Sequence, residues 1–178
     1  HDKVYHNLRA AMLETGIDDS PMYLDAQFNA EKNLMEMHDV GLNAMYIADC
    51  RVLAKMAEVL GEKADAQRLE RRANALQKAM QSLWNKEQQL FQNYDLVKNR
   101  FSDRISPTSF YPLLSGTATT QQAQAMVKKH LLNEEEFWGQ WVLPSIAKND
   151  PLYPRQRYWK GAIWAPMNFL VYLGLREY

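Results

Sequence analysis

Two consecutive segments with helical periodicity restrict the fold of this chain more than any other feature. In residues 38–60, apolar side chains recur at steps of three and four on one face, namely Leu42, Met45, Tyr46, Val52, Leu53, Met56, Val59 and Leu60. Residues 62–84 repeat the pattern with Ala66, Leu69, Ala73, Leu76, Met80, Leu83 and Trp84. Gly61 separates the two segments and can adopt the left-handed conformation that ends a helix. The sequence therefore predicts two long antiparallel helices joined by a very short turn, an αα-hairpin.

The rest of the chain is predicted to consist of shorter helices separated by long loops, so the expected fold class is all-α. Helices are expected from the N-terminus to about Glu14, from Thr119 or Thr120 to about Leu132, and within 158–177 after an irregular start near Pro166. A short extended segment is expected at 89–94. Long loops are expected at 14–35, 95–116 and 133–160, and long loops in a compact helical fold usually carry function.

Composition and charge exclude several classes of protein. The 178 residues include 21 Lys+Arg and 21 Asp+Glu, so the formal net charge is zero. A chain without excess positive charge lacks the electrostatic footprint of a nucleic-acid or membrane-surface binder. Apolar residues make up 47% and charged residues 24%, which is typical of a packed soluble domain. Cys50 is the only cysteine, so no intrachain disulfide can form.

No targeting signal in this sequence indicates a localisation. The sequence shows no secretory signal peptide and no apolar run of transmembrane length, so we expect a soluble chain without membrane partners. The chain stops at Tyr178 directly after an apolar run that is predicted to be helical. Nothing in the sequence marks that stop, so we expect 178 residues to be part of a longer domain.

An acidic loop follows the first predicted helix and reads Glu14-Thr15-Gly16-Ile17-Asp18-Asp19-Ser20-Pro21. Neighbouring carboxyl groups raise one another's pKa, because like charges disfavour ionisation. A carboxyl that keeps its proton near neutral pH can act as a general acid. The alternative is a purely structural turn, since Asp-Asp-Ser-Pro is also common turn chemistry.

Aromatic residues gather near the C-terminus. Four of the five tryptophans lie between positions 138 and 164, interleaved with tyrosines and basic residues: Trp138, Trp141, Tyr153, Arg155, Arg157, Tyr158, Trp159, Lys160 and Trp164. Flat aromatic faces bind the apolar faces of sugar rings, and neighbouring cations and amides bind hydroxyl groups. The alternative is an aromatic core at a helix junction. No metal-ligand spacing, phosphate loop or Asp-x-Asp-x-Asp-Gly calcium loop is present, so we expect no metal and no cofactor.

Together, three segments resemble glycoside hydrolase family 63, the group of the processing α-glucosidase I. Residues 14–19 resemble the family's Glu-Ser-Gly-x-Asp-[Asp/Asn] signature, which is also close to that of inverting trehalases. Residues 106–116 are similar to the family's mid-barrel loop, and residues 158–168 to its Tyr-Trp-Arg-Gly-x-x-Trp segment. The three segments occur in the family's order with an αα-hairpin between the first two, and the resemblance covers nearly the whole chain.

This resemblance implies an (α/α)6 toroid, in which six helical hairpins surround a sugar pocket. It further implies an exo-acting hydrolase that cleaves α-glucosidic linkages with inversion, acting on an oligosaccharide or α-glucoside. The family's general acid carries over to Asp18. Thr15 replaces the usual Ser, and Lys160 stands where Arg is more typical, so hydroxyl recognition there is expected to differ.

The resemblance also suggests roles for further residues. Glu14 and Asp19 are expected to orient Asp18 and to raise its pKa. Trp159 and Trp164 are expected to be platforms for sugar rings, and Lys160 and Asn168 to bind hydroxyl groups.

The family's second catalytic carboxyl group has no counterpart in these 178 residues. The family's general base is a Glu in a later motif, and this sequence ends before any such motif. Inverting hydrolysis needs two carboxyls about 6.5–9.5 Å apart, with room for the attacking water. We therefore expect residues 1–178 to be a partial (α/α)6 catalytic domain that needs the remainder of the toroid and is inactive alone.

Two alternatives remain open. The enzyme class can be a related toroid glycosidase, such as a trehalase or a mannosylglycerate hydrolase, because these share the acid motif. A different class is a non-catalytic helical interaction module. That class predicts that Asp18 and Asp19 are fully exposed on a convex surface and that the aromatic residues form a packed core or a protein-binding groove.

Overall fold

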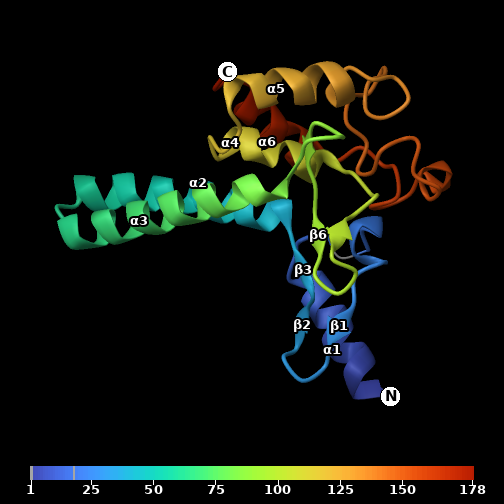
Figure 1. Cartoon of the computed structure of the whole chain (residues 1–178), viewed down its shortest axis with the longest axis horizontal. Helices are drawn as coiled ribbons and strands as arrows, with labels where there is room; N and C mark the ends of the chain where they lie inside the picture. The colour runs from blue at the N-terminus through green and yellow to red at the C-terminus, as the bar shows by residue number, and fades with distance from the viewer. Residues whose placement is uncertain (1, 18) are drawn as a thin grey trace.

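The computed structural model describes residues 2–17 and 19–178 and shows a mostly helical chain (Figure 1). Its α-helices are α1 (Asp2–Leu13), α2 (Val40–Val59), α3 (Lys63–Met80), α4 (Tyr111–Leu114), α5 (Thr120–Met126) and α6 (Ala165–Leu175). Short 3-10 helices are η1 (Pro21–Tyr23), η2 (Gln81–Leu83), η3 (Pro107–Phe110) and η5 (Tyr153–Arg155), and η4 (Val127–Leu131) is a π-helix that continues α5. In the described part of the chain, no helix is long and apolar enough to cross a membrane.

Three small antiparallel sheets correct the all-α expectation. The strands are β1 (Phe28–Asn29), β2 (Leu34–Met35), β3 (Met37–His38), β4 (Trp84–Asn85), β5 (Leu90–Phe91), β6 (Tyr94–Asp95) and β7 (Arg100–Phe101). Among the described residues β1 pairs with β2, β4 pairs with β5, and β6 lies between β3 and β7. Each strand has only two residues, which is too short to show the period-two pattern of a strand in the sequence. The extended segment expected at 89–94 is confirmed by β5 and β6.

The predicted αα-hairpin is confirmed by α2 and α3, which project together away from the rest of the chain (Figure 1). Asp39 is the N-cap of α2, because its Oδ1 accepts a hydrogen bond from the backbone N–H of Leu42 at 2.8 Å. Gly61 has a φ of +81° and ends the helix as expected. The helix predicted from Thr119 or Thr120 to about Leu132 is confirmed by α5 and η4, with a capping box at Thr119. The helix predicted within 158–177 is confirmed by α6, which has Pro166 in its first turn.

The apolar pattern predicts that the large apolar side chains of α2 are buried, but the structure buries the opposite side of this helix. The buried side carries mostly small residues, namely Val40, Gly41, Ala44, Ile47, Cys50, Ala54 and Ala57. The large apolar side chains that define the sequence pattern lie on the other side and are exposed. Gly41 permits close packing at the start of α2, since a Cβ there would lie 2.8 Å from Cβ of Thr108.

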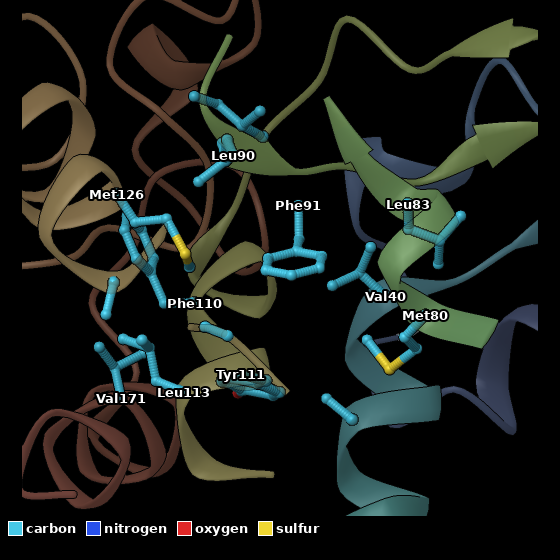
Figure 2. Packing of buried hydrophobic residues seen from close by; sticks show 14 of the residues in the cluster. Val40, Met80, Leu83, Leu90, Phe91, Phe110, Tyr111, Leu113, Met126 and Val171 are labelled. Carbon is cyan, nitrogen blue, oxygen red and sulfur yellow. The ribbon is translucent and has the colours of Figure 1, made fainter. Parts of the chain in front are cut away.

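A single main core joins the hairpin to the helices that follow it. Phe91, Phe110 and Leu113 are completely buried at its centre. Figure 2 shows Phe91 between Val40 of α2 and the side chains of η3. The core therefore connects the start of α2 to η3, α4 and α6, and this junction is where the candidate site lies.

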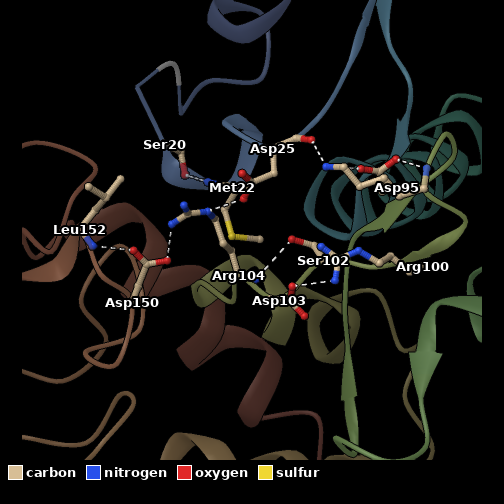
Figure 3. Close-up of polar contacts among 11 residues, drawn as sticks. Ser20, Met22, Asp25, Asp95, Arg100, Ser102, Asp103, Arg104, Asp150 and Leu152 are labelled. Atoms are coloured by element: carbon tan, nitrogen blue, oxygen red, sulfur yellow. Dashed lines mark hydrogen bonds and ion pairs between the residues drawn. The ribbon is translucent and has the colours of Figure 1, made fainter.

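An ion-pair cluster joins the segment that follows η1 to the segment that precedes η5 (Figure 3). Arg104 donates from Nε to Asp25 at 2.8 Å and from a terminal nitrogen to Asp150 at 2.6 Å. The Asp150 carboxylate is nearly buried, and its other oxygen accepts from the backbone N–H of Leu152. Although desolvation of Arg104 opposes the effect, the two carboxylates raise the pKa of its guanidinium above its usual range. Arg104 thus joins Asp25, in the segment after the acidic loop, to Asp150, in the segment before Tyr158 and Trp159.

We expect Arg104→Met to destabilise the chain, because it leaves Asp150 buried without its cation. Removing one partner of a buried ion pair costs about 3–5 kcal/mol, and partial solvent access reduces this to about 2–3 kcal/mol here. Urea unfolding measures the difference. The matched control is Arg100→Met, because the Arg100–Asp103 pair is exposed at 57% and 80% of its side chains and should contribute below about 0.5 kcal/mol. Equal losses in both variants would contradict the bracing role of Arg104.

Candidate active site

Local hydrogen bonds shape the acidic loop on both sides of Asp18. Thr15 donates its hydroxyl to the carbonyl of Met12 at 2.6 Å and accepts from the backbone N–H of Ile17 at 3.2 Å. Gly16 has a φ of +77°, which suits glycine at this turn. Ser20 then caps η1 by accepting from the backbone N–H of Met22 at 3.3 Å. Asp18 itself lies outside the described residues.

The aromatic segment before α6 forms a compact cluster. Trp159 and Trp164 stack with ring centroids 4.2 Å apart and an interplanar angle of 7°. Tyr158 meets both rings edge-on, and its carbonyl accepts from the Trp164 indole at 3.0 Å. Gly161 is required here, because its φ is +104° and a Cβ would lie 2.8 Å from the carbonyl oxygen of Tyr153. These contacts hold the rings of Tyr158, Trp159 and Trp164 in one packed aromatic cluster.

The acidic loop and the aromatic segment meet directly, although they lie 141 residues apart in the sequence. Lys160 donates to the Asp19 carboxylate, and also to its backbone carbonyl at 3.2 Å. Lys160 is buried, and the Asp19 side chain is half-buried. The interaction-module alternative predicts that Asp19 is fully exposed. The structure instead shows Asp19 half-buried and paired with Lys160. The ion pair brings two of the predicted site residues together.

A cleft of about 160 Å³ lies beside this ion pair. Its walls come from the acidic loop, η1, the first turns of α2, η3, α4 and the start of α6. The lining residues include Thr15, Gly16, Ile17, Tyr23, Asp39, Leu42, Met45, Thr108, Tyr111, Trp159 and Met167. A mostly apolar wall with a few convergent polar groups is typical of a small-molecule site.

Asp39 is a polar group in the cleft wall that the sequence patterns did not identify. Its Oδ2 accepts from the Tyr23 hydroxyl at 3.0 Å and from the Asn93 amide at 3.4 Å. Burial raises the pKa of Asp39, and its hydrogen bonds from Leu42, Tyr23 and Asn93 oppose that shift. Its place directly before the long apolar helix marks Asp39 in the sequence only as a candidate helix cap.

The tyrosines beside Asp39 predict an alkaline limit to stability. Burial raises the pKa of Tyr23 and Tyr111, and the nearby Asp39 carboxylate raises both further. Because its folded-state pKa is higher than its unfolded-state pKa, each tyrosine contributes its full stabilisation below about pH 10. That stabilisation is lost as the pH rises towards the folded-state pKa. Above pH 10, the free energy of unfolding should fall less steeply with pH in Tyr111→Phe than in the unsubstituted chain. We expect the two slopes to differ by up to about 1.4 kcal/mol per pH unit. Urea titrations between pH 9 and 11.5 test this, and identical slopes in both proteins would contradict it.

Apart from Trp159, the other predicted site residues that the structure describes are not among the residues that line the cleft. Trp159 lines the cleft directly, whereas Trp164 stacks behind it. The Asn168 amide nitrogen donates to the carbonyls of Leu143 and Trp164, both at 3.0 Å, which leaves Oδ1 to accept a hydrogen bond. Glu14 is exposed and lines a neighbouring hollow of about 320 Å³ that shares Thr15, Tyr23 and Asp39 with the cleft. Trp138 and Trp141 are exposed at 40% and 70% and are not among the residues that line the cleft.

Comparison with known proteins places this chain in a family. A family model described as "Mannosylglycerate hydrolase MGH1-like glycoside hydrolase domain" matches residues 5–178. The chain belongs to this glycoside hydrolase family. A mannosylglycerate hydrolase of Thermus thermophilus is 29% identical over 143 residues, which are 79% of this chain and 33% of that protein. A periplasmic trehalase of Escherichia coli O1:K1 is 26% identical over 182 residues, which cover 99% of this chain and 30% of that protein.

Solved structures agree with the family assignment. The crystal structure of the family 63 mannosylglycerate hydrolase from Thermus thermophilus in complex with Tris matches with a TM-score of 0.70 and 27% identity. The match covers 79% of this chain and 33% of that structure. The chain therefore has the fold of part of an (α/α)6 glycosidase and spans about a third of the length of the relatives it matches. The resemblance to family 63 is confirmed, with mannosylglycerate hydrolases and trehalases as the matching relatives.

Proposed function

We propose that this chain is the segment of an inverting, exo-acting α-glycoside hydrolase that supplies the general acid, Asp18. The observation that carries this proposal is the position of the residues on either side of Asp18. Ile17 lines the cleft, and Asp19 is paired with Lys160 next to the Trp159 platform. The loop that bears the proposed acid is thus anchored at the edge of a cleft with an aromatic wall.

The proposed chemistry divides the work between two carboxyl groups. Asp18 protonates the leaving glycosidic oxygen, while a carboxylate on the opposite side of the sugar activates water. We propose that the base is a Glu supplied by the remainder of the toroid, and that residues 1–178 alone are inactive. Glu14 and Asp19 support the orientation and protonation of Asp18 in this scheme.

Substrate contacts are proposed for the aromatic segment. Trp159, which is buried, stacks on Trp164 and lines the cleft, is the proposed platform for a sugar ring. The Asn168 amide offers Oδ1 to a sugar hydroxyl, since its nitrogen is already used. Lys160 contacts a hydroxyl with a donor that its bond to Asp19 does not use.

For the substrate, we propose a small α-glycoside of a hexose, with mannosylglycerate as the first candidate. This choice rests on the family model, which is of the mannosylglycerate hydrolase type and spans nearly the whole chain. The second candidate is trehalose, an α-glucoside, because trehalases match 99% of the chain. Trehalose is an α-glucoside, as an α-glucosidase-like activity requires, whereas mannosylglycerate is a mannoside.

The test uses a chimera in which this chain replaces the matching segment of the Thermus thermophilus mannosylglycerate hydrolase. We expect the chimera to hydrolyse mannosylglycerate or trehalose and the isolated chain to hydrolyse neither. Released hexose is measured for both proteins on mannosylglycerate, trehalose and maltose. Hydrolysis by the isolated chain that Asp18→Asn abolishes would contradict the need for a second segment. A folded chimera that cleaves none of the three sugars would contradict the proposed function.

A further inference from the structure

The cleft and the neighbouring hollow have part of their walls in common. Thr15, Tyr23, Asp39 and Leu42 line both the cleft of about 160 Å³ and the hollow of about 320 Å³. Three of these four side chains carry oxygen, and we call Thr15, Tyr23 and Asp39 the shared polar wall. None of the described residues that line the two spaces is a lysine or an arginine. What this wall can bind is therefore decided by its hydrogen bonds.

Tyr23 gives its only proton to Asp39. Its hydroxyl donates to Oδ2 of Asp39 at 3.0 Å, and an ionised carboxylate can only accept hydrogen bonds. Burial and the Asp39 carboxylate raise the pKa of Tyr23, so the proton stays on the phenol oxygen. That oxygen can still accept a hydrogen bond, but it has no proton left to offer to a ligand.

Asp39 is held in the role of acceptor by donors at both of its oxygens. Oδ1 accepts from the backbone N–H of Leu42 at 2.8 Å, and Oδ2 accepts from the amide of Asn93 at 3.4 Å. The Asn93 amide cannot turn around, because its oxygen accepts from the backbone N–H of Val40 at 2.8 Å. This chain of hydrogen bonds fixes the direction in which the Tyr23 proton points.

Thr15 likewise offers a ligand only an acceptor. Its hydroxyl proton goes to the carbonyl oxygen of Met12 at 2.6 Å, and the hydroxyl oxygen accepts from the backbone N–H of Ile17 at 3.2 Å. A hydroxyl group has one proton and two lone pairs, so Thr15 keeps one lone pair for a ligand. The hydroxyls of Thr15 and Tyr23 are neighbours, since a contact with Thr15 partly opposes the rise in the pKa of Tyr23.

We propose that Tyr23 and Thr15 form an acceptor-only subsite that binds a hydroxyl group of the sugar as a hydrogen-bond donor, with Asp39 as the positioning residue that sets this direction. The inference rests on the proposed function and adds the chemical group that the subsite recognises. A carboxylate brings only acceptors and is repelled by Asp39, so the subsite excludes the glycerate carboxylate of mannosylglycerate. The group that it binds is a hydroxyl of the hexose.

An acceptor-only subsite distinguishes a hydroxyl group from a fluorine atom. Fluorine is similar in size to a hydroxyl group and accepts hydrogen bonds weakly, but it has no proton to donate. A site built to hydrogen-bond a substrate hydroxyl rejects an analogue without it, because the polar groups of the site are left unpaired. A deoxyfluoro sugar should therefore bind here as poorly as the deoxy sugar.

The test measures binding by calorimetry in the chimera carrying Asp18→Asn, so that turnover does not consume the ligand. The ligands are methyl α-mannoside, methyl α-glucoside, and their deoxy and deoxyfluoro analogues at each hydroxyl position. We expect one position at which both analogues bind about 3- to 10-fold more weakly than the parent glycoside. Tyr23→Phe should weaken binding of the parent by the same factor and leave both analogues and D-glycerate unchanged.

Asp39→Asn tests the direction of the hydrogen bond. The backbone N–H of Leu42 needs the amide oxygen of this variant, so the amide nitrogen faces Tyr23. Tyr23 then accepts from that nitrogen and can donate its own proton into the cleft. In this variant the deoxyfluoro analogue should bind about 3-fold more tightly than the deoxy analogue. Tyr94→Phe is the matched control and should leave all affinities unchanged, because the Tyr94 hydroxyl donates to Asn99 at 2.8 Å outside the cleft.

Several outcomes would overturn the subsite. These are no binding of either glycoside, unchanged binding of both glycosides by Tyr23→Phe, and deoxyfluoro analogues that bind like the parent at every position. No gain for the deoxyfluoro analogue in Asp39→Asn would contradict the role of Asp39. If Tyr23→Phe does not fold, the comparison of deoxy with deoxyfluoro analogues still decides.

The subsite and the proposed function can fail separately, because the readout is binding and not turnover. A chimera that shows the expected binding pattern but cleaves no sugar would support the subsite and contradict only the proposed function. A chimera that cleaves mannosylglycerate without this binding pattern would contradict only the subsite.

Discussion

Asp18→Asn in the chimera is expected to lower kcat on an α-glycoside about 10³-fold and to leave the unfolding temperature within about 2 °C. General acid catalysis contributes roughly 10²–10⁴ to a rate, and an amide has no acidic proton to give to the leaving oxygen. The neighbours Ile17 and Asp19 are held by contacts that do not require a carboxyl at position 18. The measurement is steady-state hydrolysis of mannosylglycerate or trehalose, together with thermal unfolding.

A change of leaving group makes this prediction specific to proton donation. Fluoride leaves with much less need for protonation, so the glycosyl fluoride of the same hexose should lose far less rate in Asp18→Asn than the natural glycoside. Asp103→Asn is the control, because the Asp103 side chain is 80% exposed and lies outside the cleft. Equal losses on the fluoride and on the glycoside would contradict the role of Asp18 as the acid.

Lys160→Met is expected to have the second-largest effect, lowering kcat/KM of the chimera about 10- to 100-fold. The substitution removes the cation that joins the Asp19 carboxylate to the aromatic segment, so the acidic loop loses its anchor at the cleft. A small misplacement of a catalytic group can cost about 10²-fold in rate. Asp19 is half-exposed and can be hydrated, so the stability loss should stay near 1 kcal/mol.

A conservative variant separates anchoring from simple packing. Lys160→Arg keeps the charge, and arginine is the residue more typical of the family at this place, so activity should be largely retained. Asp19→Asn removes the other partner and should reproduce most of the Lys160→Met defect. If Lys160→Arg is as impaired as Lys160→Met, the ion pair is not what positions the loop.

The long helices could be predicted from sequence because their apolar spacing extends over about 20 residues each. The side of α2 that packs within the chain could not be predicted, because this helix is apolar on both sides. Small residues such as Ala44 and Ala54 form the buried side, while Leu53 and Met56 stay exposed. Periodicity shows that a face exists, but the choice between two apolar faces depends on which other helices are present.

The candidate site was predictable where a motif marks it and not where distant segments meet. Residues 14–19 and Trp159 were identified from local patterns, and the structure brings Asp19 and Trp159 to the same region. The Lys160–Asp19 pair and the Tyr23–Asp39 bond join segments that are far apart or unremarkable in sequence. An Asp before a helix is commonly a cap, so nothing local distinguishes Asp39 as part of a cleft wall.

The anomeric configuration of the first product tests the central claim most directly. Proton NMR of the chimera during the first minutes of hydrolysis of mannosylglycerate, whose leaving group has no anomeric carbon, should show β-mannose before mutarotation produces the α-anomer, and Asp18→Asn should abolish that signal. This result follows if Asp18 protonates the leaving oxygen while a second carboxylate directs water to the opposite face. Initial release of the α-anomer, or unchanged release of β-hexose by Asp18→Asn, would contradict the account.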